Sequence, residues 1–161
     1  MIVVLDNIRS VHNVGSIFRT ADAAGVAEIY LCGITPTPLN KIGKKRGDFI
    51  KVSLGAEDSM PWRKVENVAE AIKSLKDKGF HVFALEQVDG SLPYTNIGKD
   101  FDFQRSVLVL GNEVSGLNEN ILKLADNIIE IPMAGKKESL NVAVAFGVAI
   151  FEMRRRGRID K

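Results

Sequence analysis

The sequence predicts an α/β fold: a mainly parallel sheet flanked by helices. Short apolar runs rich in β-branched residues recur along the chain, at residues 2–5, 27–31, 81–85, 106–110 and 127–131. Segments with helical patterns separate most of these runs, and strands that alternate with helices are typical of a parallel sheet. The uninterrupted run SVLVL at 106–110 favours a strand in the buried middle of that sheet.

Two helices are expected in the first half of the chain. Asn13 is a good N-cap for the first, which would turn Val14, Ile17, Phe18 and Ala21 inward and end at Gly25. Pro61, after an irregular segment at 54–62, is a candidate start for the second. Its amphipathic face is formed by Val65, Val68, Ile72 and Leu75, and it is closed by Gly79.

The second half ends in a helix around which the chain is expected to be organised. A short helix is expected at 118–125, and Pro132 then ends the strand at 127–131. After a polar turn, Ser139 or Asn141 can cap a helix that has no charged residue between Val142 and Phe151. A helix that is apolar all round predicts burial on all sides, and Gly157 is a natural residue to follow its end.

Length and composition indicate one ordinary globular domain, residues 1–161. The chain has 45% hydrophobic and 26% charged residues. It has no apolar run long enough to span a bilayer and no signal peptide. A single cysteine, Cys32, excludes an internal disulfide, and the two histidines lack partners at metal spacing. We therefore expect a cytoplasmic protein without a bound metal.

Basic residues are clustered although the net charge is only +2. The clusters lie at Lys41, Lys44, Lys45 and Arg46, at Lys136 and Lys137, and at Arg154, Arg155, Arg156 and Arg158. Such clusters can contact phosphates, but solvated surface lysines have the same pattern.

The turn after the central strand, GNEVSGL at 111–117, is the most distinctive local feature. It lacks the Lys-Ser/Thr pair of a phosphate-binding P-loop, and no GxGxxG follows a strand, which argues against a nicotinamide-dependent enzyme. What remains is a tight turn whose backbone can approach a ligand closely. Its carboxylate, Glu113, could face a ligand cation or the solvent.

Three segments taken together resemble the signature motifs of the SpoU (TrmH-type) RNA ribose methyltransferases, a family of the SPOUT superfamily. They are NxxxxxNxGxxxRTADAxG from Asn7, LVLGNEVSGL from Leu108 and IPMAGKKESLNVAVA from Ile131. The resemblance covers nearly the whole chain, in the family's order and spacing. It implies methyl transfer from S-adenosylmethionine to a ribose 2′-hydroxyl of RNA, and a C-terminal deep trefoil knot.

The resemblance also implies roles for individual residues. The catalytic positions would be Arg19, Asn13, Glu113, Ser139 and Asn141, with Arg19 as a phosphate clamp rather than a base, because a guanidinium is very hard to deprotonate. The cofactor would contact Leu85, Gly111, Glu113, Ile131, Met133, Leu140 and Asn141, largely through backbone groups. Capping alone remains an alternative for Asn13, Ser139 and Asn141. A surface ion pair remains one for Arg19.

Family members are homodimers in which Arg19 of one subunit reaches the cofactor pocket of the other. Many carry an added RNA-binding domain, and none is expected in this chain. RNA would then be bound by the core dimer, with candidates at Arg9, Lys41, Lys44, Lys45, Arg46 and Lys136, and at the terminal arginines. Transfer RNA is the first expectation for the substrate, and ribosomal RNA remains open. The competing interpretation is a non-catalytic RNA-binding or assembly protein that keeps the fold.

Overall fold

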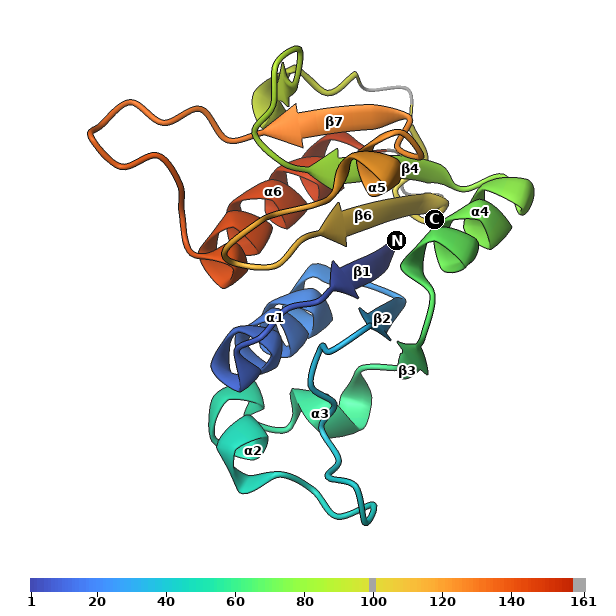
Figure 1. Cartoon of the computed structure of the whole chain (residues 1–161), viewed down its shortest axis with the longest axis vertical. Coiled ribbons are helices and arrows are strands. Elements are labelled where there is room, and N and C mark those ends of the chain that lie inside the picture. The colour runs from blue at the N-terminus through green and yellow to red at the C-terminus, as the bar shows by residue number, and fades with distance from the viewer. Residues whose placement is uncertain (99–100, 158–161) are drawn as a thin grey trace.

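A computed structural model of the chain describes residues 1–98 and 101–157. Within them, seven strands form one sheet in the order β3-β2-β1-β6-β4-β7-β5, and all neighbouring strands are parallel (Figure 1). The strands are β1 (Ile2–Asp6), β2 (Glu28–Cys32), β3 (Trp62–Val65), β4 (His81–Leu85), β5 (Leu92–Pro93), β6 (Ser106–Leu110) and β7 (Asn127–Glu130). The predicted α/β class is confirmed, and β6 is buried between β1 and β4. The trefoil knot stays a prediction.

Helices cover both faces of the sheet. They are α1 (Val11–Ala24), α2 (Gly47–Ser53), α3 (Ala56–Ser59), α4 (Val68–Asp77), α5 (Glu119–Leu122) and α6 (Val142–Arg156), with a 3₁₀ turn, η1 (Tyr94–Asn96). Alternate strand residues face opposite sides. On β1, Val3 and Leu5 join the core beneath α1 and α6, whereas Ile2 and Val4 join the core beneath α4 and α5. Figure 1 shows α1 and α6 side by side on one face.

The start of α1 differs from the prediction, because Ser10 and not Asn13 is the N-cap. Ser10 is extended, with φ −84° and ψ 119°, and its hydroxyl accepts a hydrogen bond from the Asn13 N–H. Asn13 therefore lies in the first turn of the helix, and its amide is free to bond elsewhere. The predicted inward face is confirmed, as is Gly25, which is left-handed with φ 70°.

The segment after β2 also differs from the prediction. Residues 47–59 include the short helices α2 and α3, and Pro61 directly precedes the edge strand β3 and begins no helix. Its carbonyl accepts the Ile29 N–H at 2.9 Å, and a proline is tolerated at the start of such a strand. Helices of four to seven residues are too short to give a clear periodicity. Val65, assigned to the second helix, ends β3, and that helix begins at Val68.

The expectation that α6 is buried on all sides is wrong. Phe146, Ala149, Ile150 and Met153 are buried, but Val144, Val148 and Phe151 are 52%, 36% and 50% exposed. In the described chain α6 packs on the sheet and α1 along one side only, so its other apolar side faces outward. Asn141 caps the helix by accepting the Ala143 N–H at 2.9 Å. Gly157 follows the last residue but is extended rather than left-handed.

Two features often used to assign function are missing from the described residues. No helix there combines the length and the apolar character needed to cross a membrane. No cluster of three or more His, Cys, Asp or Glu side chains in the same residues is arranged to hold a metal ion.

Candidate functional site

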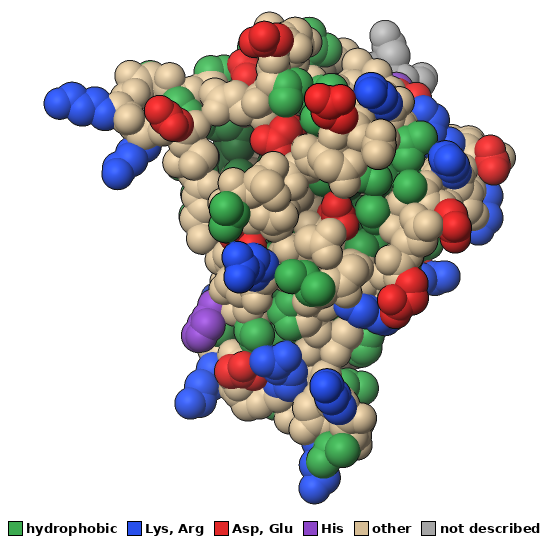
Figure 2. Space-filling view, viewed as in Figure 1, with side chains coloured by type: hydrophobic (Ala, Val, Ile, Leu, Met, Phe, Trp, Pro, Cys, Tyr) green, Lys and Arg blue, Asp and Glu red, His purple; other side chains and the backbone are tan. Residues whose placement is uncertain are grey.

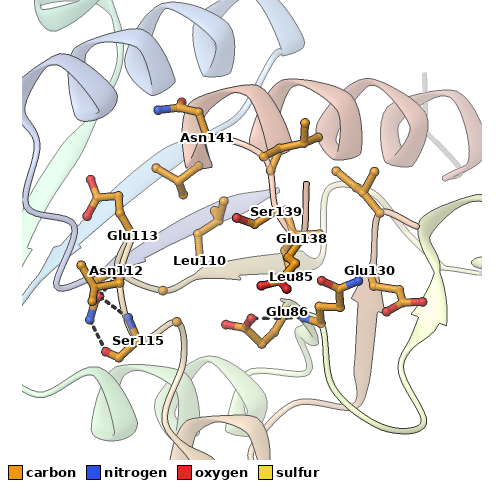
Figure 3. A pocket seen from close by; sticks show the side chains of 18 of the residues that line it. Leu85, Glu86, Leu110, Asn112, Glu113, Ser115, Glu130, Glu138, Ser139 and Asn141 are labelled. Atoms are coloured by element: carbon orange, nitrogen blue, oxygen red, sulfur yellow. Dashed lines mark hydrogen bonds between the residues drawn. The ribbon is translucent and has the colours of Figure 1, made fainter. Parts of the chain in front are cut away.

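A cavity of about 570 Å³ lies where β4, β6 and β7 end and α6 begins. The carboxyl edge of a parallel sheet is where ligands bind in α/β folds, and this volume is within the usual range for small-molecule sites. All seven predicted cofactor positions line it: Leu85, Gly111, Glu113, Ile131, Met133, Leu140 and Asn141. Ser139 lines it as well. Figure 3 shows these segments converging around the cavity.

The turn after β6 folds back on the strand that precedes it. A Cβ on Gly111 would lie 2.3 Å from the Gly116 carbonyl carbon, so only glycine fits there. Gly116 is left-handed with φ 64° and its N–H donates to the Asn112 carbonyl at 3.0 Å. The Asn112 side-chain oxygen accepts the N–H groups of Val114 and Ser115 at 2.9 Å each. The turn is thus held by its own residues, and its backbone forms one wall of the cavity.

Glu86, directly after β4, fixes this turn from the other side. Its carboxylate accepts the Leu117 N–H at 2.8 Å and the Gln87 N–H at 3.1 Å. A Cβ on Gly116 would lie 2.2 Å from the same carboxylate. Glu86 therefore joins the ends of β4 and β6 at the cavity wall.

Glu113, Asn13 and Asn141 form a continuous hydrogen-bonded chain across three distant segments. The Asn13 amide donates to the Glu113 carboxylate at 2.7 Å, and the Asn141 amide donates to the Asn13 carbonyl at 3.0 Å. The Glu113 carboxylate also accepts the backbone N–H groups of Arg9 and Ser10 at 3.0 and 3.2 Å. This chain connects the start of α1, the turn after β6 and the N-cap of α6, and it explains why Asn13 is not used as a cap.

The hydrogen bonds decide the charge state of Glu113. Its partial burial alone would raise the pKa, but the N–H groups of Arg9, Asn13 and Ser10 together outweigh that effect and lower the pKa of the carboxyl. The side chain is therefore a carboxylate at neutral pH with its oxygens occupied. A carboxylate in this state orients its donors and is a poor acceptor for a substrate proton.

Residues 131–141 pass the cavity without helix, strand or hydrogen-bonded turn. The backbone N–H groups of Met133 and Leu140 have no hydrogen-bond acceptor among the described residues. Buried or ligand-facing backbone groups normally find partners, so this segment offers free donors and acceptors to a ligand. In Figure 1 it loops outward from the end of β7 before returning to α6.

The cavity lining is acidic. It includes four glutamates, Glu86, Glu113, Glu130 and Glu138, and contains no lysine, arginine or histidine among the residues that line it. Glu130 is held by the Ser91 hydroxyl at 2.8 Å. A lining of this charge favours a ligand that carries positive charge.

Comparison with known proteins assigns the chain and its fold to a family. Residues 1–151 match the family described as the SpoU rRNA Methylase family. The chain belongs to this SpoU family. It is 33% identical over 156 residues to the tRNA (guanosine(18)-2′-O)-methyltransferase of Aquifex aeolicus. The matched region comprises 96% of this chain and 69% of that relative. Other curated relatives are longer, and the chain spans 39% to 59% of their length.

Solved SpoU structures have the same fold. The AdoMet-bound rRNA methyltransferase of Sinorhizobium meliloti superposes with a TM-score of 0.84 at 34% identity, over 96% of this chain and 55% of that one. A structure described by the 2-OH methylation of C/U34 on tRNA gives a TM-score of 0.78 at 27% identity, over 96% of this chain and 94% of that one.

Arg19, which the family resemblance predicts to be catalytic, does not line the cavity of its own chain. It lies on an exposed position of α1 and is absent from the cavity lining. Asn13 and Arg19 are six residues apart, which on an α-helix of 3.6 residues per turn places them on different faces. Asn13, Glu113, Ser139 and Asn141 do lie together at the cavity or its rim.

The predicted RNA-binding residues divide into two groups. Arg9, Lys41, Lys44 and Lys136 are exposed. Lys45 pairs with Asp58 at 2.6 Å and Arg46 pairs with Asp48 at 2.9 Å. Ion pairs on a surface are weak, so they reduce the availability of these two cations without removing it.

The three arginines in the last turn of α6 have structural contacts. Arg155 and Arg156 pair with Glu152 at 2.7 and 2.5 Å, and Arg156 also donates to the Ile97 carbonyl. Arg154 stacks over the Phe103 ring, 5.6 Å from its centroid. These contacts make the three arginines weaker RNA-binding candidates than the exposed lysines, and Arg158 lies outside the described residues.

Sequence reasoning missed three acidic residues of the SpoU site: Glu86, Glu130 and Glu138. Their positions in the sequence could have indicated a role at the site. Glu86 follows one strand and Glu130 ends another, at the edge of the sheet where ligands bind. Their convergence depends on β4 and β7 being neighbours, which the sequence does not state.

Proposed function

We propose that the protein transfers a methyl group from S-adenosylmethionine to a ribose 2′-hydroxyl of RNA. The observation that carries this proposal is the acidic cavity at which Asn13, Glu113 and Asn141 meet in a member of the SpoU family. Each of three segments contributes one member of that hydrogen-bonded chain, and Asn13 lies 100 residues before Glu113 and 128 residues before Asn141.

The cavity fits S-adenosylmethionine in size, charge and donor set. The cofactor carries a sulfonium and an ammonium group, and the lining has four glutamates and no basic residue among those that form it. The free N–H groups of Met133 and Leu140, with the close backbone of Gly111, are suited to an adenine base that is recognised by peptide groups. When bound, the cofactor supplies a methyl group on a positively charged sulfur.

The chain's own residues would position the nucleophile and stabilise its developing charge. Arg19 would hold a phosphate of the RNA and stabilise the charge that develops on the ribose 2′-oxygen, while the guanidinium stays charged. The 2′-oxygen would take the methyl group from the sulfonium and release its proton to solvent water, with S-adenosylhomocysteine as the second product. Glu113 and Asn13 would fix the start of α1 against the cavity rim. Ser139 and Asn141, at the entrance to α6, would contact the ribose or order the loop around it.

A homodimer would bring Arg19 to the cavity. Arg19 is exposed and away from its own chain's cavity, and α6 has an exposed apolar row formed by Val144, Val148 and Phe151. These residues recur every three or four positions and form one stripe on the helix. Because Val144 lies in the first turn of α6, beside the cavity rim, a second copy packed on this stripe would reach the rim with its own α1.

Transfer RNA is the proposed substrate, with ribosomal RNA as the alternative. The Aquifex relative is named for a transfer RNA, and a solved structure of which this chain covers 94% is described by methylation of a transfer RNA. The Sinorhizobium relative is described as an rRNA methyltransferase. With an RNA substrate we also propose a cytoplasmic location. We favour a catalytic role over a non-catalytic one, because the three motifs that carry the resemblance hold the polar residues Asn13, Arg19, Glu113, Ser139 and Asn141.

The experiment that tests the activity is transfer of labelled methyl from S-adenosylmethionine to unmodified transfer RNA and ribosomal RNA. We expect label in the transfer RNA fraction, inhibited by S-adenosylhomocysteine. Label in ribosomal RNA alone would keep the activity and change the substrate. Tight cofactor binding without transfer to either RNA would overturn the proposed enzyme and favour the assembly-protein interpretation.

A further inference from the structure

The long segment between β2 and α2 ends in a preformed hairpin, residues 39–45, called here the 39–45 hairpin. Leu39 and Lys45 form an antiparallel bridge, and the Asn40 N–H donates to the Lys44 carbonyl at 2.8 Å. Gly43 is left-handed with φ 74°, and the Asn40 side-chain oxygen accepts the N–H groups of Ile42 and Lys44 at 3.0 and 2.9 Å. A hairpin loop with a left-handed glycine and an asparagine acceptor has a defined shape before any partner binds.

The base of this hairpin is fixed to the segment that leads to the active site. Thr35, which is buried, donates to the Leu5 carbonyl at 2.9 Å and accepts the Ile8 N–H at 3.1 Å. The Asn7 side chain accepts the Ile34 N–H at 3.1 Å. These bonds join the segment to the end of β1 and to the turn before Ser10, whose N–H contacts Glu113.

The other end of the hairpin is fixed by α2. Phe49 is buried and packs edge-on against Phe18 of α1, with 5.1 Å between ring centroids. A Cβ on Gly15 would lie 3.1 Å from the Val52 Cβ, so α1 and α2 are in close contact. With both ends anchored, the tip has a set position relative to α1 and therefore to the cavity rim.

The tip presents cations and one large apolar side chain to solvent. Ile42 is 74% exposed, and Lys41 and Lys44 are exposed beside it. Neither lysine has an acidic partner within 4.0 Å among the described residues, whereas Lys45 and Arg46 do. Figure 2 shows basic side chains gathered with exposed apolar ones at the end of the molecule that holds this segment.

We propose that the 39–45 hairpin is an RNA-contact element in which Lys41 and Lys44 bind phosphates and Ile42 packs on an unpaired nucleobase. This inference rests on the proposed function and adds to it a specific contact surface. Two unpaired lysines complement the phosphate backbone. Bases in RNA loops are splayed out and available to apolar side chains, unlike those in a duplex. A preformed hairpin loses little conformational freedom on binding, which favours affinity.

The test is equilibrium binding of unmodified transfer RNA over a range of salt concentrations. Lys41→Gln/Lys44→Gln should weaken binding and reduce the slope of log affinity against log salt by roughly 1.5, since each phosphate contact contributes about 0.7–0.9. Ile42→Ala should weaken binding roughly fivefold with the slope unchanged, because it removes apolar contact and no charge.

A matched control removes the same charge elsewhere. Lys73 and Lys78 are exposed at α4 and its C-cap, on the opposite face of the sheet, so Lys73→Gln/Lys78→Gln should change neither affinity nor slope. Hairpin variants that bind like this control would overturn the inference. So would an Ile42→Ala variant whose oligomeric state differs from wild type in light scattering, since the tip would then contact a second copy.

The failure of this inference and of the proposed function are distinguishable. Wild-type protein that transfers methyl groups, with hairpin variants that bind RNA normally, would overturn only the hairpin contact. Wild-type protein that neither binds nor methylates RNA would overturn both. Equal melting temperatures of wild type and variants are expected, because the substituted side chains are exposed.

Discussion

Asn13 does not cap a helix, and its side chain instead joins Glu113 to Asn141. Replacing it by alanine removes the bonds to Glu113 and Asn141. We expect turnover to fall at least about tenfold, because misplaced catalytic groups lose rate steeply. The free energy of unfolding should fall by only about 1–2 kcal/mol. Initial-rate kinetics and chemical denaturation measure the two effects. His12→Ala, at an exposed neighbour, is the control, and equal losses in both variants would remove Asn13 from the site.

Gly111 is required by the close approach of the turn to its own strand. Gly111→Ala should destabilise the protein by about 3 kcal/mol or more, because the added methyl collides with backbone that has nowhere to move. Gly135→Ala is the matched control, since nothing lies within 4 Å of its added methyl. Denaturant unfolding of both variants gives the comparison. A Gly111 variant as stable as the Gly135 variant would show that the turn can open.

The residues predicted to bind the cofactor line one cavity, because the family motifs name residues directly. Sequence reasoning misplaced the role of Asn13, since an asparagine near a helix start has the same pattern whether it caps the helix or bonds across the site. The nearby Ser10 was the better cap and was overlooked. Glu86 was missed because its partner, the Leu117 N–H, is distant in sequence.

Among the helices, the last turn of α6 is stabilised by ion pairs between side chains. Glu152 lies between Arg155 and Arg156, which lower its pKa to about 2 from the ordinary value of 4.5. A carboxyl with a lowered pKa contributes stability that is fully present above pH 4.5 and is lost as the pH falls toward 2. Glu152→Gln should therefore melt at a lower temperature than wild type at pH 7, and the difference should shrink below pH 4.5.

Thermal melts followed by circular dichroism at several pH values measure this effect. Glu66→Gln, at an exposed glutamate before α4, is the control for removing one negative charge. If the gap between Glu152→Gln and wild type stayed constant down to pH 2, the arginine pair would not be the source of the stability.

The main strands were predictable because each is short, apolar and bounded by turn residues. The edge strands β3 and β5 were not, because they are two to four residues long and partly exposed. The length of α6 was predicted correctly, but the prediction that it is buried on all sides was wrong. An apolar helix surface has the same pattern whether its own chain or a second copy covers it.

In the whole molecule, the proposed homodimer places Arg19 of one subunit at the cavity of the other. Arg19→Ala should nearly abolish methyl transfer and change cofactor affinity only a few-fold, and Asn141→Ala should also be inactive. If the two variants are mixed so that subunits exchange, about a quarter of wild-type activity should return, because half of the dimers are mixed and each has one intact site. A mixture as inactive as its components, with exchange verified, would place Arg19 in its own subunit's site.

The strand order is the property of the whole molecule that the sequence reveals least. Pairing of β1 with β6, about a hundred residues apart, sets the position of Glu113 beside the start of α1. Nothing in the local pattern of either strand encodes that choice. The family resemblance predicted that the segments at Leu85, Gly111 and Ile131 meet, but it gave no order for the strands.

The position of the transferred methyl group distinguishes ribose methylation from base methylation. Unmodified transfer RNA would be incubated with the protein and S-adenosylmethionine, digested to nucleosides and analysed by mass spectrometry. We expect one nucleoside whose added mass lies on the ribose and whose base is unchanged on fragmentation. A methyl group on the base, with the ribose unmodified, would contradict it.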